Sequence, residues 1–258
     1  MFPKILLAVV FLLGLFSSAL ALGELGITRD TSIGDGNARQ AYNSKCTFKT
    51  QPGNADFLKM IHAAYNEMKA ISLSKKQNDN RPSAMIGLSI GNEVYFASSV
   101  TGPKQFIYHQ VSWKGGDGTL NPDLSADFKE VTDALKECAE KSTTGRPQHG
   151  NNANCGEIMS TLLWMVDHEG KSPRDHSPKI AAYNEKGYLK PCSSDPGDVK
   201  WGCAQWTQIM GLEVVQNIAN LNLEAHDFPK PEEEPKPLML SNCQTVEVDK
   251  KKTKPSQE

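Results

Sequence analysis

Three cysteines and one glutamate lie at positions where their side chains could hold and use a metal ion. Cys155 and Glu157 stand in a Cys-Gly-Glu run at the predicted start of a strongly apolar helix, while Cys192 follows a proline in a loop. Cys203 stands at the predicted start of the next helix. A cysteine at a helix N-terminus ionises more readily, because the helix dipole and free N–H groups stabilise the thiolate. Three thiolates and one water make the open tetrahedral site of a zinc ion.

Glu157 is the only charged side chain between Asn151 and Val166. A carboxylate in an otherwise apolar helix is costly unless it has a partner or a task. Zinc lowers the pKa of a bound water towards about 7, and a neighbouring carboxylate can carry the proton that this water releases. The helix dipole alone also stabilises an acid in the first turn, so a purely structural role for Glu157 stays open.

The elements that must position these side chains follow from the spacing of apolar residues. Helical spacing predicts helices over 55–76, 125–141, 155–167 and 203–219. Alternating apolar residues on either side of Gly91-Asn92 predict a β-hairpin over 84–100. Shorter strands are predicted over 105–111, 179–183 and 238–248. This order favours an α/β fold with helices packed on both faces of a small sheet.

The run Cys155-Gly156-Glu157, followed by Pro191-Cys192 and then Cys203, resembles the zinc-dependent cytidine deaminase-like superfamily. The signature of that superfamily is His/Cys-x-Glu, then Pro-Cys-x-x-Cys. The predicted order of elements is similar over roughly residues 55–220, and the resemblance implies a three-layer α/β/α deaminase-like sheet. Ten residues separate Cys192 from Cys203, where the signature has two. Residues 193–202 are therefore expected to bulge out as a loop.

The resemblance implies that Cys155, Cys192 and Cys203 hold one Zn²⁺ ion. It also implies that Glu157 moves a proton from the zinc-bound water to the leaving amine. The implied activity is hydrolysis of an exocyclic amine on a small-molecule or nucleobase-type substrate. Whether a nucleic acid is bound stays open, but the net charge of −2 disfavours long ones, since phosphate contacts dominate such affinity. No oligomeric state is predicted.

Asn152 and Asn154 are candidate substrate-binding residues. Their amides could hydrogen-bond polar groups of a substrate held near the predicted zinc ion. Asparagines just before a helix also serve as caps, and that interpretation stays open.

The six cysteines also allow a different interpretation. An even count in an exported protein fits three disulfides, with 15 pairings to choose from, and a Cys192–Cys203 disulfide would abolish the zinc site. The chain would then be a non-catalytic, disulfide-stapled effector or interaction protein. Zinc ligation, by contrast, leaves Cys46, Cys138 and Cys243 as an odd set. A cysteine nucleophile pairing Cys155 with His149 or His168 is a third alternative, which no local pattern supports.

The N-terminus predicts export. Lys4, the apolar residues 5–15 and the Ala19-Leu20-Ala21 run are typical of a cleavable signal peptide over 1–21. The apolar run is shorter than the roughly 20 residues that a bilayer requires, so a secreted mature chain without a membrane segment is expected. The expected organisation is an irregular segment over 22–54, a deaminase-like domain over 55–228 and a Lys/Glu/Pro-rich tail over 229–258.

Overall fold

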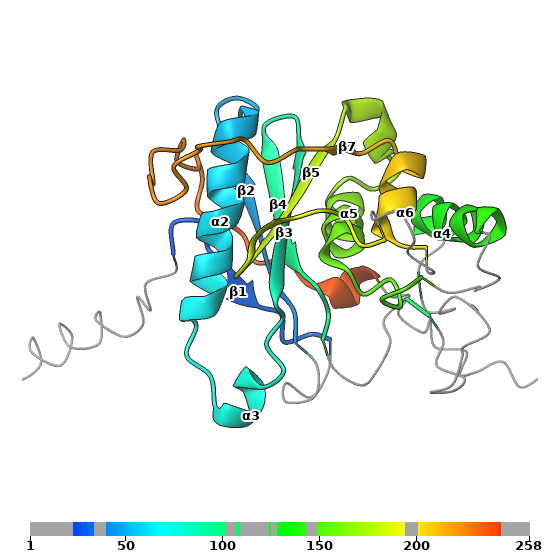
Figure 1. Cartoon of the computed structure of the whole chain (residues 1–258), viewed down its shortest axis with the longest axis horizontal. Coiled ribbons are helices and arrows are strands. Elements are labelled where there is room, and N and C mark those ends of the chain that lie inside the picture. Colours follow the sequence, from blue (N-terminus) through cyan, green and yellow to red (C-terminus); the bar gives the residue numbers. More distant parts are fainter. Residues whose placement is uncertain are drawn as a thin grey trace, which may run out of the picture.

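The computed structural model describes residues 23–33, 40–101, 107–108, 124, 128–142, 149–193 and 201–243 (Figure 1). The strands are β1 (Thr28–Arg29), β2 (Tyr42–Thr47), β3 (Ala84–Ile90), β4 (Glu93–Ser98), β5 (Lys179–Asn184), β6 (Gly187–Leu189) and β7 (Glu213–Val214). The helices are α2 (Asn54–Ala70), α3 (Lys75–Asn78), α4 (Lys129–Lys141), α5 (Gly156–Asp167) and α6 (Cys203–Ile209), with 3₁₀ turns η2 (Pro173–His176) and η3 (Leu240–Cys243).

These elements form a mixed α/β fold around a seven-stranded sheet. The strand order is β1-β2-β4-β3-β5-β6, and β7 also pairs with β5. The pairs are antiparallel except for the parallel pair of β5 and β7. The predicted α/β class is therefore confirmed.

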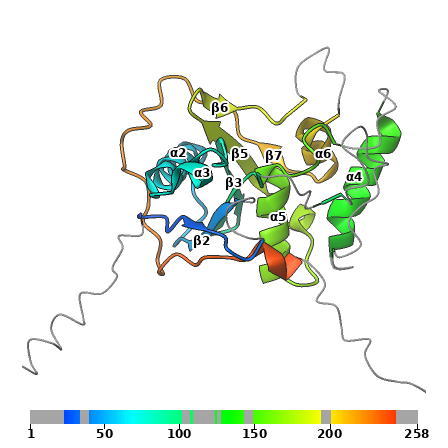
Figure 2. The same ribbon diagram turned by 90° about the horizontal axis from the view of Figure 1, so that it is seen from below.

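The sheet buries apolar side chains on both faces. Helix α2 contacts β3 and β5, whereas α5 contacts β3 and β4, and the two helices lie on opposite sides of the sheet (Figure 2). Alternation along β3 explains this arrangement, because Met85 joins the cluster under α2 while Ile86 joins the cluster under α5. Gly87 lets α2 approach closely, since a Cβ there would lie 2.8 Å from Ile61.

The predicted elements nearest the site cysteines are confirmed. The hairpin over 84–100 forms β3 and β4, and Gly91 takes the left-handed conformation of its turn with φ of 57°. The helix over 155–167 is α5, and the strand over 179–183 is β5. Of the strand expected over 105–111, only Ile107 and Tyr108 lie within the described residues.

Two predicted helices are shorter than expected. Helix α2 ends at Ala70 rather than at residue 76. At this end, Arg81 donates hydrogen bonds to the carbonyl oxygens of Lys69 (2.9 Å) and Ile71 (2.6 Å). Helix α6 ends at Ile209 rather than at 219, because Gly211 turns the chain with φ of 65° and residues 213–214 pair with β5.

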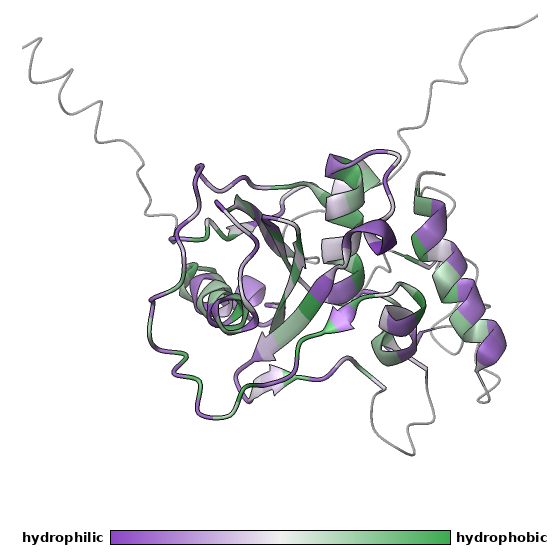
Figure 3. Ribbon diagram, turned by 90° about the horizontal axis from the view of Figure 1, so that it is seen from above, coloured by the Kyte–Doolittle hydropathy of each residue, from purple (hydrophilic) through white to green (hydrophobic). Residues whose placement is uncertain are grey.

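The third helix, α4, begins at Lys129. The expected start at 125–127 lies outside the described residues. Its buried side chains recur at helical spacing and are Val131, Ala134, Leu135 and Cys138. Figure 3 shows hydrophilic and hydrophobic segments alternating along this helix at the right-hand edge of the view. The alternation is that of a helix that buries one face and exposes the other.

The expectation of an irregular segment over 22–54 is wrong. Strand β2 lies between β1 and β4 in the sheet. Tyr42, Cys46 and Phe48 are fully buried in the cluster under α2. The alternation of these side chains is a strand pattern, and the glycine- and asparagine-rich composition around it obscured the signal.

The segment after Phe228 runs along the part of β2 that β1 leaves unpaired. Lys45 and Lys236 exchange backbone hydrogen bonds of 2.8 and 2.9 Å, and the Glu232 N–H donates to the Thr47 carbonyl oxygen at 2.8 Å. The segment covers a sheet edge that would otherwise expose backbone donors and acceptors. The strand expected over 238–248 is wrong where it is described, because residues 240–243 form η3.

A half-buried ion network surrounds the side chain of Lys45 on β2. The Lys45 ammonium pairs with Glu93 (2.6 Å) and with Asp167, and His168 Nε2 lies 3.1 Å from Glu93. The donors of Glu93, Asp167 and His168 are close enough together for a metal ion, but Lys45 already supplies a positive charge there. Burial opposes ionisation of Asp167, yet hydrogen bonds from Lys45 and Tyr95 hold the pKa of its carboxyl below the ordinary value.

A Lys45→Met substitution is expected to lower the free energy of unfolding by about 1–2 kcal/mol at pH 7, between the effects of exposed and buried ion pairs. Because the folded-state pKa of Asp167 is depressed, its contribution is present above about pH 4 and is lost as the pH falls through the folded pKa. Urea unfolding at pH 7 and pH 3 measures the effect. Lys59→Met is the control, since its partner Asp227 is 66% exposed. An equal loss for Lys45→Met at both pH values would contradict the prediction.

Candidate metal centre

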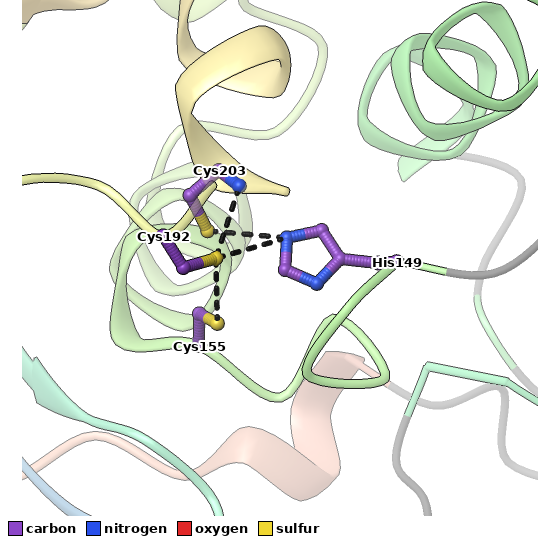
Figure 4. A group of neighbouring side chains, drawn as sticks. All are labelled: His149, Cys155, Cys192 and Cys203. Atoms are coloured by element: carbon purple, nitrogen blue, oxygen red, sulfur yellow. Dashed lines mark hydrogen bonds between the residues drawn. The ribbon is translucent and has the colours of Figure 1, made fainter. Parts of the chain in front are cut away.

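Three segments distant in sequence bring Cys155, Cys192 and Cys203 together (Figure 4). Cys155 immediately precedes α5, Cys203 is the first residue of α6, and Cys192 lies in the loop after β6. The Sγ atoms of Cys155 and Cys192 are 3.9 Å apart. Residues 194–200, most of the expected bulge between Cys192 and Cys203, lie outside the described residues.

His149 joins this cluster, although no spacing in the sequence predicts it as a ligand. Its Nε2 atom lies 3.4 Å from Cys203 Sγ and 3.6 Å from Cys192 Sγ. The ring is buried and packs edge-on against Trp201, with 5.2 Å between the ring centroids. The four donor atoms all lie within 4.8 Å of one another.

This donor set fits a tetrahedral metal ion. Zn–S bonds of about 2.3 Å and Zn–N bonds of about 2.0–2.1 Å correspond to tetrahedral edges of about 3.8 Å between two sulfurs and about 3.6 Å between sulfur and nitrogen. The observed S···S distance of 3.9 Å and N···S distances of 3.4 and 3.6 Å agree with those edges.

The same distances exclude the disulfide interpretation of the cluster. A disulfide requires sulfurs about 2.05 Å apart, and all six cysteines are free. The alternative interpretation of the six cysteines as three disulfides is therefore wrong.

Local packing explains why glycines adjoin two of the site cysteines. The backbone N–H of Cys203 donates to Cys192 Sγ at 3.2 Å. A Cβ on Gly202 would lie 2.7 Å from the Cys192 carbonyl oxygen and 2.8 Å from its Sγ. A Cβ on Gly156 would lie 2.6 Å from the Ala97 carbonyl oxygen of β4. Both glycines allow the helix starts to come close enough for the sulfurs to meet.

A Gly156→Ala substitution is expected to lower the free energy of unfolding by about 1–3 kcal/mol, the usual cost of overpacking. It should also weaken metal binding, because the start of α5 must move away from β4. Thermal unfolding and a metal titration measure the two effects. Gly53→Ala is the matched control, since a Cβ there meets nothing within 4 Å. The packing argument fails if the two variants behave alike.

The charges of the cluster favour a cation at its centre. Hydrogen bonds from the thiols of Cys155 and Cys203 lower the pKa of Cys192. Donating that hydrogen bond to Cys192 raises the pKa of Cys155, and burial raises the pKa of Cys203. Without an ion the cluster therefore favours one thiolate over several, whereas a bound divalent cation inverts this preference.

Glu157 lies beside this cluster with its side chain buried. Burial raises the pKa of its carboxyl to about 7, and the negative charge of Cys192 adds to the effect. The structure therefore places the predicted proton carrier in the same buried environment as the sulfurs.

Asn152 and Asn154 lie in the loop that joins His149 to Cys155. Asn152 has a left-handed backbone with φ of 54°, and the Asn154 carbonyl oxygen accepts a hydrogen bond from Val100 N–H at 2.9 Å. The N-cap residue of α5 is Cys155, whose side chain makes no capping hydrogen bond. Substrate binding by the two asparagines stays a prediction.

The three cysteines outside the cluster are buried free thiols. Burial raises the pKa of each one to about 12. They are Cys46, Cys138 and Cys243. A thiol with so high a pKa is nearly all protonated at neutral pH and reacts slowly. Their odd number therefore does not demand an intermolecular disulfide.

No family model, curated protein or solved structure matches the chain. The geometry of the His149, Cys155, Cys192 and Cys203 cluster is therefore the starting point for function. Across the described ranges, no helix has both the length and the apolar character needed to span a bilayer. The predicted signal peptide over 1–21 lies outside those ranges.

Proposed function

We propose that this chain is an exported zinc-dependent deaminase that hydrolyses the exocyclic amine of a nucleobase-type substrate. The observation that carries the proposal is the convergence of Cys155, Cys192 and Cys203 beside the buried carboxyl of Glu157. The order of elements supports it, because α2, the β3–β4 hairpin, α5, β5 and α6 follow one another as in the resembled superfamily. We infer that α2, the sheet and α5 are the three layers of a deaminase-like fold.

The residues divide the chemical work in a simple way. Cys155, Cys192 and Cys203 would hold the ion, which when bound supplies an activated water at neutral pH. A Glu157 carboxylate oxygen would accept a proton and deliver it to the leaving amine. Water then contributes the oxygen that replaces the amine, and the amine leaves as ammonia. Burial of Glu157 keeps bulk water away from this transfer.

A second candidate function rests on His149. Four protein donors complete a tetrahedron, and closed Cys₃His sites are structural in most zinc proteins. In that case zinc would staple the ends of α5 and α6, and the chain would be a non-catalytic effector or interaction protein.

Metal content and ammonia release test the proposal. We expect one zinc per chain by elemental analysis, lost in Cys155→Ala and retained in Cys138→Ala. We also expect ammonia from one of a panel of cytosine, adenine and guanine nucleosides and short single strands. Absence of zinc would refute both candidates. One zinc without ammonia from any member of the panel would favour the structural role.

Export predicts a defined mature N-terminus. Expression of the full chain in a eukaryotic secretory host should release a protein that begins at Leu22, after the Ala19-Leu20-Ala21 run. N-terminal sequencing of the medium and of the cell pellet measures the cleavage. Replacing Ala19 and Ala21 with arginine is the control and should block it. A protein that keeps Met1 and stays in the cells would contradict export.

A further inference from the structure

His149 occupies the corner of the cluster that a catalytic zinc site leaves to water. Its Nε2 atom points at the sulfurs of Cys203 and Cys192 from 3.4 and 3.6 Å (Figure 4). The side chain is almost fully buried, with 2% of the residue exposed. A three-cysteine site with an open fourth position is the catalytic form, whereas a fourth protein donor closes it.

We propose that His149 is a displaceable fourth ligand that closes the zinc site at rest and gives its position to water in the active form. The inference rests on the proposed zinc site and adds a regulatory state to it. While the imidazole is bound, Glu157 has no water to deprotonate, so the imidazole must give way to water before the reaction.

The hydrogen bond on the other ring nitrogen makes His149 the ligand most easily lost. The backbone N–H of Asn151 donates to His149 Nδ1 at 3.1 Å. A metal bound at Nε2 requires the proton to sit on Nδ1, where ligand histidines usually find an acceptor. Here Nδ1 faces a donor instead. Ligation therefore forfeits the Asn151 hydrogen bond, and release of the imidazole restores it.

The loop that carries His149 is held at its ends and strained in its middle. The His149 N–H donates to the Tyr108 hydroxyl oxygen at 3.2 Å, and the Gly150 N–H donates to the Trp201 carbonyl oxygen at 2.9 Å. Between these anchors and Cys155, two successive non-glycine residues, Asn152 and Ala153, have left-handed backbones with φ of 54° and 55°. Such strain persists where the surroundings impose it and is found in switch regions.

The alternative assignment makes His149 a hydrogen-bond donor to the sulfurs rather than a ligand. In that arrangement Nε2 keeps its proton, the Asn151 bond stays intact and the fourth position is permanently open to water. The two assignments differ in whether a metal–nitrogen bond exists, so the experiment measures that bond directly.

The first experiment uses the full wild-type chain with ¹⁵N-labelled histidine and ¹¹³Cd in place of zinc. We expect one imidazole Nε2 resonance to be split by coupling to ¹¹³Cd. The split signal should disappear in His149→Ala and persist in His226→Ala, whose histidine is exposed away from the cluster. A cadmium-loaded wild-type protein with no coupled imidazole would overturn the proposal without any variant having to fold.

The second experiment follows Co²⁺ absorption in wild type and His149→Ala. We expect azide to shift the spectrum of the variant and not that of the wild type. Added imidazole should return the variant to the wild-type spectrum, and zinc affinity should fall at least tenfold. Equal azide responses in the two proteins would overturn the proposal for His149 while leaving the zinc site standing. If the wild type binds neither zinc, cadmium nor cobalt, the zinc site itself would be refuted.

Discussion

Removing the metal ion is expected to lower the free energy of unfolding by about 4 kcal/mol, relative to protein in which free zinc is about a thousandfold above its Kd. The reason is that a ligand that binds only the folded state stabilises that state, and the stabilisation grows with the ratio of free ligand to Kd. The cluster connects three chain segments that are distant in sequence. Cys155 precedes α5, Cys192 lies in the loop after β6, and Cys203 begins the short helix α6. Without the ion these ends lose their common attachment, and two further thiols must stay protonated in a buried site.

Urea unfolding of the zinc-loaded and chelator-treated protein measures this effect. The Cys203→Ala variant should resemble the chelated wild type and gain nothing from added zinc. Cys138→Ala is the matched control, because Cys138 is a buried free thiol on α4 outside the cluster. The free energy of unfolding of this variant should fall only slightly, as expected for a small truncation in the core, and added zinc should still stabilise it. Identical midpoints with and without metal would mean that the cluster does not bind the ion.

Hydrogen exchange should locate where the stability is lost. Helix α6 spans only residues 203–209 and is the element most dependent on its first residue. Helix α5 is packed against β3 and β4 along its length. Chelation should therefore release the amides of α6 first and those of central α5 last, as expected for local unfolding of the less densely packed unit.

The convergence of Cys155, Cys192 and Cys203 could be predicted because their positions carry a physical signal. Cys155 and Cys203 stand at helix starts that periodicity locates, and Cys192 follows a strand and a proline. Glu157 stood out as a lone charge in an apolar helix. Topology then brings the ends of these elements together, in agreement with the local signals, although those signals alone left zinc ligation and disulfides open.

His149 could not be predicted in the same way. It lies in a polar loop, without a second histidine or cysteine at ligand spacing. Its placement depends on tertiary contacts, namely the edge-on Trp201 ring and the hydroxyl of Tyr108. Trp201 is 52 residues distant in the sequence and Tyr108 is 41. No periodic or short-range pattern encodes such an approach.

The missed elements of the fold have a similar cause. Strand β2 lies in a segment rich in turn-forming residues, and its pairing with β4 outweighs this local composition. The helical spacing of apolar residues in α6 continues past Ile209 in the sequence. Residues 213–214 nevertheless form β7, which pairs with β5. In both cases sheet hydrogen bonding overrides the local preference.

A Glu157→Gln substitution is expected to reduce the rate of deamination by about 10²–10⁴-fold, the usual contribution of a positioned acid–base group. Glutamine keeps the size and hydrogen-bonding reach of the side chain but can neither accept nor deliver the proton. Zinc content should stay at one per chain, because the carboxyl is not among the four donors of the cluster.

Stability separates this catalytic role from a structural one. The Glu157 carboxyl is buried, and burial disfavours its charged form. Replacing a buried ionisable group with a neutral one of similar volume is often neutral or stabilising. We therefore expect Glu157→Gln to unfold at the same urea concentration as the wild type or higher while its ammonia release falls. Glu137→Gln, on the exposed face of α4, is the control for both measurements. A variant that keeps full activity would exclude Glu157 as the proton carrier, and one that lost stability together with zinc would assign it to the scaffold of the site.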